Sequence, residues 1–302
     1  MKKYIKGMII VGVAAVIVIG SVIIRVNKEN KGVEGSAVNV SAQTDVERNN
    51  SPNQPSPDFL PGAKFTSEDS KEDNNRFVFD SRRADFDGDG KVDDVVLIGE
   101  KQDDNPYVQN IGVAIKDSHT GKFSIASIGE LNSGLDPKLF IGSFNKAKSN
   151  DILVSFATGG SGGVYQFSLL SYHDGQVKAI VPQETLNHGL VLETQCLPGF
   201  NLKITDKNTG YTATIDLHKG SVDYERLGIY NEKGELLQDP MVLVDGFSVL
   251  KPEVNGDGIC ELRGIQRISV GAHANSVANA ESVWKVSNGQ LKLLSENIEA
   301  LN

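Results

Sequence analysis

The sequence has 302 residues, of which 39% are hydrophobic and 23% charged, and its net charge is −9. This is long enough for one large domain or two small ones. Residues 1–31 contain six Lys or Arg and one Glu, so the rest of the chain carries −14. An acidic body argues against a nucleic-acid-binding protein, because nucleic acids are held mainly by basic side chains.

An uncharged apolar run occupies residues 7–24. As a helix it would be about 27 Å long, close to the hydrocarbon thickness of a bilayer. The alternative is a cleaved secretory signal, but such signals have a shorter apolar core and a small-residue cleavage site, whereas Ile24 is followed directly by Arg25. We therefore predict a single-pass membrane anchor over residues 1–25, with the N-terminus in the cytoplasm. Both interpretations place the body outside the cell.

Residues 26–75 are rich in Asn, Ser, Glu, Lys and Pro and have no apolar periodicity. This composition predicts a disordered linker that holds the body away from the membrane. Residues 76–302 show only β signals: short apolar or alternating strands separated by turn sequences such as 118–121, 173–175, 208–210, 232–234 and 287–289. We expect these residues to form an all-β repeat domain.

The most informative stretch is residues 85–93, DFDGDGKVD, which has carboxylates at alternate positions. Calcium takes six to eight oxygen ligands at about 2.3–2.6 Å, and a loop that points every second side chain inward supplies them. We expect Asp85, Asp87 and Asp89 to give side-chain oxygens, Lys91 its backbone carbonyl and Asp93 the closing carboxylate. The plain alternative is an Asp/Gly-rich surface turn that binds no ion.

This loop is not an EF-hand, because the twelfth position holds Val96 instead of Glu and an apolar, β-branched strand follows. A calcium loop followed by a strand resembles the FG-GAP and VCBS-type repeats of extracellular β-propellers, including those of integrin α chains. The resemblance covers these nine residues closely and the rest of the chain weakly. It implies an exported protein whose β-blades are stabilised by calcium.

A second copy of the loop occupies residues 253–261, EVNGDGICE. Its expected ligands are Glu253, Asn255, Asp257, the Ile259 carbonyl and Glu261. We expect weaker calcium binding here, because this loop carries one less negative charge. A degenerate copy at residues 142–151 keeps the Phe-Asn pair and the following strand but few ligands, so no metal is expected there.

The turn glycines repeat at a regular spacing. Gly121, Gly175, Gly234 and Gly289 are separated by 54, 59 and 55 residues, and Phe200 marks a possible fourth copy of the loop. A period of about 55 residues fits a four-stranded propeller blade, so the pattern predicts a propeller-like body of about four units. The alternative is an unclosed or merged β-fold built from the same units.

Other candidate chemistry is weak. The glycine-rich stretch 159–163 lacks the Gly-Lys-Ser/Thr ending of a phosphate loop and is better explained as a turn or a close backbone approach. The five histidines are scattered without metal-binding spacing. Trp284 is expected in the core. Export would permit a disulfide between Cys196 and Cys260, although Cys260 is also compatible with a small buried side chain.

Two classes of function follow from these observations. The first is a membrane-tethered, extracellular calcium-binding module that binds a surface protein or a polysaccharide. The second is a hydrolase or lyase that acts on surface polysaccharide with a calcium-stabilised scaffold. The sequence has no nucleophile–base signature, which favours the first class.

Overall fold

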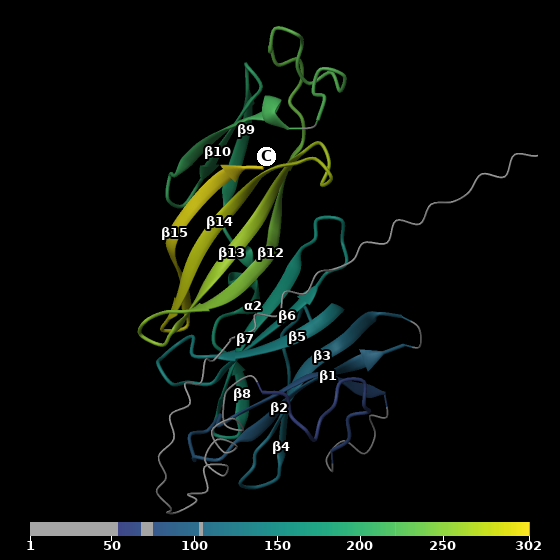
Figure 1. Cartoon of the computed structure of the whole chain (residues 1–302), viewed down its shortest axis with the longest axis vertical. Helices are drawn as coiled ribbons and strands as arrows, with labels where there is room; N and C mark the ends of the chain where they lie inside the picture. The colour runs from purple at the N-terminus through teal and green to yellow at the C-terminus, as the bar shows by residue number, and fades with distance from the viewer. Residues whose placement is uncertain (1–53, 68–74, 103–104, 221, 302) are drawn as a thin grey trace, which may run out of the picture. The chain divides into compact units, whose positions relative to one another are not determined.

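The computed structural model describes residues 54–67, 75–102, 105–220 and 222–301, which form an all-β body with three antiparallel sheets (Figure 1). The predicted all-β class is confirmed for these residues. The predicted anchor, residues 1–25, lies outside the described residues. Within the described part of the chain, no helix is long and apolar enough to cross a membrane.

The first sheet has eight strands in the order β1-β2-β3-β5-β6-β7-β8, with β4 paired to β3. Its strands are β1 (Arg76–Ala84), β2 (Asp93–Lys101), β3 (Tyr107–Lys116), β4 (Phe123–Ser127), β5 (Gly134–Gly142), β6 (Asp151–Ala157), β7 (Tyr165–His173) and β8 (Gln176–Ala179).

Two smaller sheets and two short helices complete the body. The second sheet has the order β11-β10-β9, and the third is a meander in which neighbouring strands are consecutive. The helices are α2 and the 3-10 helix η1. The bounds are α2 (Gln183–His188), β9 (Leu192–Leu197), β10 (Asn201–Asp206), β11 (Thr212–Asp216), η1 (Leu217–Lys219), β12 (Val242–Val254), β13 (Cys260–Val270), β14 (Ser276–Ser287) and β15 (Gln290–Ala300).

The predicted repeat is present in three places: β1–β4, β5–β8 and β12–β15. Each unit has two antiparallel strands joined by one of the predicted loops, then a third strand and a hairpin to a fourth. The hairpin glycines Gly121, Gly175 and Gly289 all have positive φ, between 70° and 73°, which a side chain would make unfavourable. The regular spacing of these glycines therefore reflects the same kind of hairpin turn in each of the three units.

The prediction of a propeller is wrong. The first two units do not form separate blades, because Tyr107 and Val108 of β3 pair with Leu135 and Gly134 of β5 and merge both units into one sheet. The expected fourth unit is a three-stranded sheet, β9–β11. Its Gly234 turn joins no pair of strands and is closed by an isolated bridge between Tyr230 and Leu236. None of the three sheets among the described residues closes on itself.

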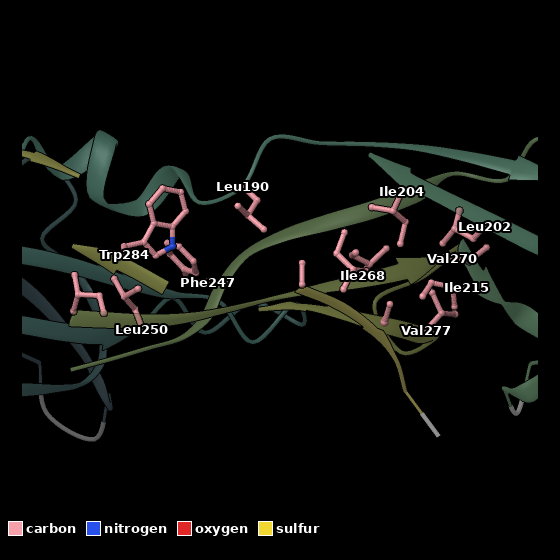
Figure 2. Close-up of a cluster of buried hydrophobic side chains, with 14 of the residues drawn as sticks. Leu190, Leu202, Ile204, Ile215, Phe247, Leu250, Ile268, Val270, Val277 and Trp284 are labelled. Atoms are coloured by element: carbon pink, nitrogen blue, oxygen red, sulfur yellow. The ribbon is translucent and has the colours of Figure 1, made fainter. Parts of the chain in front are cut away.

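A hydrophobic core joins the second and third sheets. Figure 2 shows Leu202 and Ile204 of β10 and Ile215 of β11 beside Val270 and Val277 of the third sheet. All five are buried. Burial of apolar side chains contributes roughly 25 cal/mol per Å² removed from water, so this contact is a main source of stability for residues 190–300.

Strand β2 is buried on both of its faces. Val95 and Leu97 point into one cluster, whereas Val96 and Ile98 join Phe65 in another. The second cluster is covered by residues 54–67, which form the bridges Gln54↔Arg83 and Lys64↔Phe77 with β1 and place aromatic rings over the sheet. This part of the predicted linker is therefore packed onto the body, because the outer face of β2 is apolar and has to be covered.

Candidate metal centre

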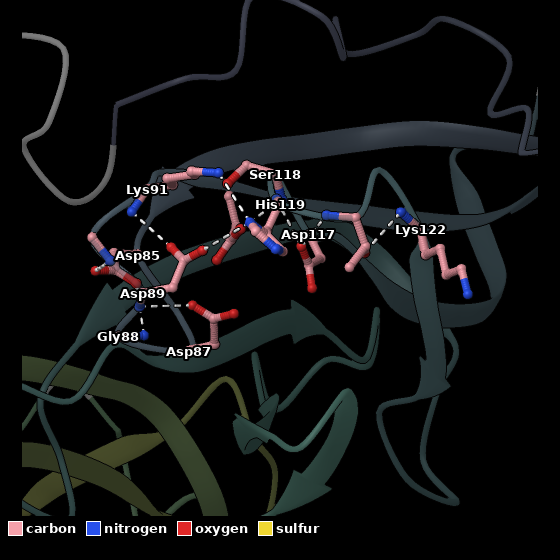
Figure 3. Close-up of polar contacts among 12 residues, drawn as sticks. Asp85, Asp87, Gly88, Asp89, Lys91, Asp117, Ser118, His119 and Lys122 are labelled. Atoms are coloured by element: carbon pink, nitrogen blue, oxygen red, sulfur yellow. Dashed lines mark hydrogen bonds and ion pairs between the residues drawn. The ribbon is translucent and has the colours of Figure 1, made fainter.

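The candidate site is the loop between β1 and β2. Here Asp85, Asp87 and Asp89 each offer an oxygen, and the three oxygens lie within 4.8 Å of one another (Figure 3). It is the one group of three or more such Asp, Glu, His or Cys ligands among the described residues. The sequence predicted these three side chains together.

The loop folds through hydrogen bonds from its own backbone to these carboxylates. Asp85 accepts from the N–H groups of Gly88 (2.7 Å) and Gly90 (3.0 Å), and Asp87 and Asp89 each accept from the residue two positions ahead. Gly88 and Gly90 have φ of 82° and 86°, so the chain turns where side chains are disfavoured. This pattern gathers three carboxylates on one short loop.

Asp93 occupies a different position below the loop. Its carboxylate is buried and accepts hydrogen bonds from the backbone N–H of Phe86 (3.0 Å) and of Ser118 (2.8 Å). Burial raises the pKa of Asp93, which the two N–H donors partly oppose, and the nearby Asp87 charge raises it further. Asp93, expected as the closing ligand, thus ties the Asp85 loop to the β3–β4 hairpin and lies outside the three-carboxylate cluster.

The β3–β4 turn brings His119 to the loop, beside Lys91 of the loop itself. The Lys91 Nζ lies 3.0 Å from His119 Nδ1, which is 3.9 Å from Asp89 Oδ2. The turn is held by Asp117, whose carboxylate accepts from the N–H groups of His119 and Thr120. Sequence reasoning considered His119 only as a turn residue, because its approach to Asp89 depends on the pairing of β2 with β3.

The donor set fits a hard cation. Carboxylate oxygens are the ligands that calcium prefers, and three carboxylates this close repel one another unless a cation lies among them. Asp87 and Asp89 are exposed, and Asp85 is half-buried, so an ion could reach the oxygens from solvent. The arrangement can bind a cation, but it contains no nucleophile or paired general base for catalysis.

The second predicted site has a different environment. Residues 253–261 form the β12–β13 hairpin, in which Glu253 lies opposite Glu261. Glu253 pairs with Arg263 (3.1 Å) and Asp257 with Lys285 (3.3 Å), so two of the three carboxylates of this loop already have cationic partners. The structure does not gather Glu253, Asp257 and Glu261 into a close cluster. The backbone N–H of Asn255 donates a hydrogen bond to the Ile259 carbonyl across the turn (3.0 Å).

The degenerate loop, residues 142–151, reproduces the support of the first loop without its acidic cluster. Asp151 accepts from the N–H groups of Phe144 (2.9 Å) and Asn145 (3.2 Å), as Asp93 accepts from Phe86. The sequence signal for this shared loop shape is an Asp at the first position of the next strand, Asp151 in β6 and Asp93 in β2.

The remaining sequence candidates have structural roles. The glycine-rich stretch forms a turn, one of its two expected roles, and Gly162 lies against the Asp245 side chain, where an added Cβ would come within 2.9 Å of the carboxylate. Trp284 is buried, as predicted, and its Nε1–H donates to Ser282 Oγ (2.7 Å). Cys196 and Cys260 are both buried and free, so no disulfide joins them.

Comparison with known proteins identifies the family. The family model of the YybI C-terminal domain matches residues 190–299. The uncharacterized protein YybI of Bacillus subtilis strain 168 is 30% identical over 217 residues, which cover 72% of this chain and 82% of the relative. The chain belongs to the YybI family. No solved structure matches the chain.

This result corrects the expected resemblance. The matching family is YybI, and neither the family match nor the relative gives support to an FG-GAP or VCBS repeat. The nine-residue acidic loop led to the wrong family because a short pattern of alternating carboxylates recurs in unrelated proteins. The match to residues 190–299 spans β9–β15 and includes the second loop, whereas the Asp85 loop lies before it.

Proposed function

We propose that this YybI-family protein is an exported module tethered at the cell surface, and that its Asp85 loop binds calcium. The observation that carries this proposal is the cluster of Asp85, Asp87 and Asp89, with oxygens within 4.8 Å of one another. Export and the membrane tether are inferred from the apolar run at residues 7–24. The body would present its surface to an extracellular protein or polysaccharide.

Calcium would act on the loop as a structural ion. It would neutralise the three carboxylates and fix the connection between β1 and β2, and through Asp93 also the β3–β4 hairpin. Extracellular calcium sites commonly have dissociation constants of about 0.1–1 mM. At about 1 mM calcium, such a site would stabilise the fold by roughly 0.4–1.4 kcal/mol.

A calorimetric titration with calcium tests whether the Asp85 loop binds this ion. Wild-type protein should show a saturable event in the range of about 0.1–1 mM from the Asp85 loop, tighter than any event from residues 253–261. Magnesium should replace calcium poorly because it requires tighter octahedral geometry. The matched control is Asp58→Asn, which changes an exposed carboxylate outside the loop and should leave the event intact. An isotherm without a calcium event would refute the proposal.

Protease added to intact cells tests export. We expect it to remove the body, whereas a body that is protected by the cell would refute the surface location.

Incubation of the protein with cell-wall and matrix polysaccharides tests the alternative function as an enzyme. Release of sugars would favour a hydrolase or lyase over a binding module.

A further inference from the structure

Two acidic side chains meet where the second sheet packs on the third. Asp206 ends β10 and is 1% exposed, and Glu296 lies on β15. Asp206 Oδ1 accepts from the Asn208 backbone N–H (2.6 Å), and Glu296 Oε1 accepts from the Thr209 hydroxyl. Each carboxyl group therefore has one oxygen with a donor from the same β10–β11 turn.

The other oxygen of each group has no donor. Asp206 Oδ2 and Glu296 Oε2 are both inaccessible to solvent, and neither has a hydrogen-bond partner. A buried carboxylate oxygen without a donor is unfavourable, and two adjacent buried carboxylates cannot both ionise without compensation. No ion pair between described residues includes either group. Lys207, next in the turn, lies 3.8 Å from Glu193 instead.

We infer that Asp206 and Glu296 share one proton, and that this carboxyl pair is a pH-sensitive clasp between the second and third sheets. The Glu296 carboxyl group is the donor, from Oε2 to Asp206 Oδ2, so that one proton satisfies both orphaned oxygens. Carboxyl pairs that share a proton are known wherever two such groups are held in contact.

The electrostatics of Glu296 agree with this assignment. Burial raises the pKa of Glu296, the Thr209 hydroxyl opposes the rise, and the charge and hydrogen bond of Asp206 raise it further. Neutral side chains lie near the pair: Ser282 lies opposite Glu296 on β14, and the Tyr211 hydroxyl donates to Asn297. Glu299, two positions beyond Asn297, accepts from the Asn297 side-chain amide.

The sign of the pH effect follows from the raised pKa. The folded state holds a proton on Glu296 that the unfolded chain releases at a lower pH. The stabilisation is therefore complete below the unfolded pKa, about 4.3, and is lost as the pH rises through the folded value. Raising the pH leaves negative charges on the buried Asp206 and on the neighbouring, half-buried Glu296, and should loosen the packing of β10 and β11 on β15. This clasp does not depend on calcium and lies outside the Asp85 loop.

The substitution Glu296→Gln provides the test, because its amide can donate to Asp206 Oδ2 at every pH. Thermal melts of the whole 302-residue chain should show that the variant gains stability relative to wild type as the pH rises from 4.5 to 7.5. The expected gain is roughly 3–5 °C for each unit by which folding raises the pKa. Glu299→Gln, an exposed change on the same strand, should show a difference that is independent of pH.

Two outcomes would overturn the shared proton. One is a difference between Glu296→Gln and wild type that stays constant with pH. The other is stabilisation of wild type by calcium that disappears in Glu296→Gln, which would mean that a cation bridges the two carboxylates. If the variant fails to fold, the carboxyl carbon of Glu296 can be titrated by NMR in wild type. A midpoint at or below about 4.3 would also contradict the proposal.

Discussion

The side-chain amide of Asn150 donates a hydrogen bond of 2.6 Å to the main-chain carbonyl of Asp85. The two residues are 65 positions apart, so the degenerate loop of the second repeat unit supports the acidic loop of the first. A second contact joins the degenerate loop to the loop of the third unit, where the Cys260 N–H donates to the Ser143 carbonyl (2.6 Å). The three loops of the repeated units are therefore connected in series, by one side-chain and one backbone hydrogen bond.

Replacing Asn150 with Ala should weaken this connection. The substitution removes one donor to the Asp85 carbonyl, and the loss of such a hydrogen bond typically costs about 1 kcal/mol. We expect a lower melting temperature and weaker calcium binding, because the loop is less well ordered before the ion arrives. Lys146→Ala, an exposed change on the same loop, is the control. Equal melting temperatures for Asn150→Ala and wild type would show that the contact is not formed in solution.

The two acidic loops should differ in affinity. Asp89→Ala removes one of the three clustered carboxylates and should abolish the tighter calcium event in a calorimetric titration. Asp257→Ala should spare that event, because Asp257 pairs with Lys285 and lies on the other loop. The ranking fails if Asp257→Ala eliminates the tighter event while Asp89→Ala retains it.

A glycine in the third sheet should not tolerate a side chain. A Cβ on Gly264 would press against the Phe247 ring and lie 2.9 Å from Ser282 Oγ. Overpacking of this kind typically costs about 1–3 kcal/mol, so Gly264→Ala should melt several degrees lower than wild type. Gly256→Ala is the matched control, since nothing lies within 4 Å of its added Cβ. Equal melting of both variants would mean that β12 and β13 are less closely packed than described.

The β3–β4 turn beside the Asp85 loop should be less stabilising in acid. The N–H groups of Thr120 and His119 lower the pKa of Asp117 below its ordinary value of 3.8. A lowered folded pKa means that the stabilisation is present above the unfolded value and is lost as the pH falls through the folded one. Asp117→Asn should therefore melt lower than wild type at pH 7, and the difference should shrink at strongly acidic pH. A difference that persists or grows in acid would contradict this role.

Local patterns predicted much of this fold. The β2 strand followed from an uninterrupted apolar run, and the hairpins at Gly121, Gly175 and Gly289 followed from turn chemistry that acts over a few residues. The clustered Asp85, Asp87 and Asp89 were predictable for the same reason, because alternate residues of one short loop share a side.

Contacts between distant segments were not predictable in this way. The pairing of Tyr107 with Leu135 merges two units into one sheet, and no local signal distinguishes it from the gap between two blades. The Asn150 donor to Asp85 and the Asp206–Glu296 pair likewise depend on how separate strands pack. Asp93 was assigned as a ligand because sequence spacing cannot show that its carboxylate is already bonded to Phe86 and Ser118.

A structure from crystals grown in calcium would test most directly whether the Asp85 loop binds this ion. We predict a single strong density peak among the carboxylates of Asp85, Asp87 and Asp89, at about 2.3–2.6 Å from their oxygens, with an anomalous signal that Asp89→Ala removes. Water or empty density among these carboxylates, at calcium concentrations well above 1 mM, would contradict the assignment of this loop as a calcium site.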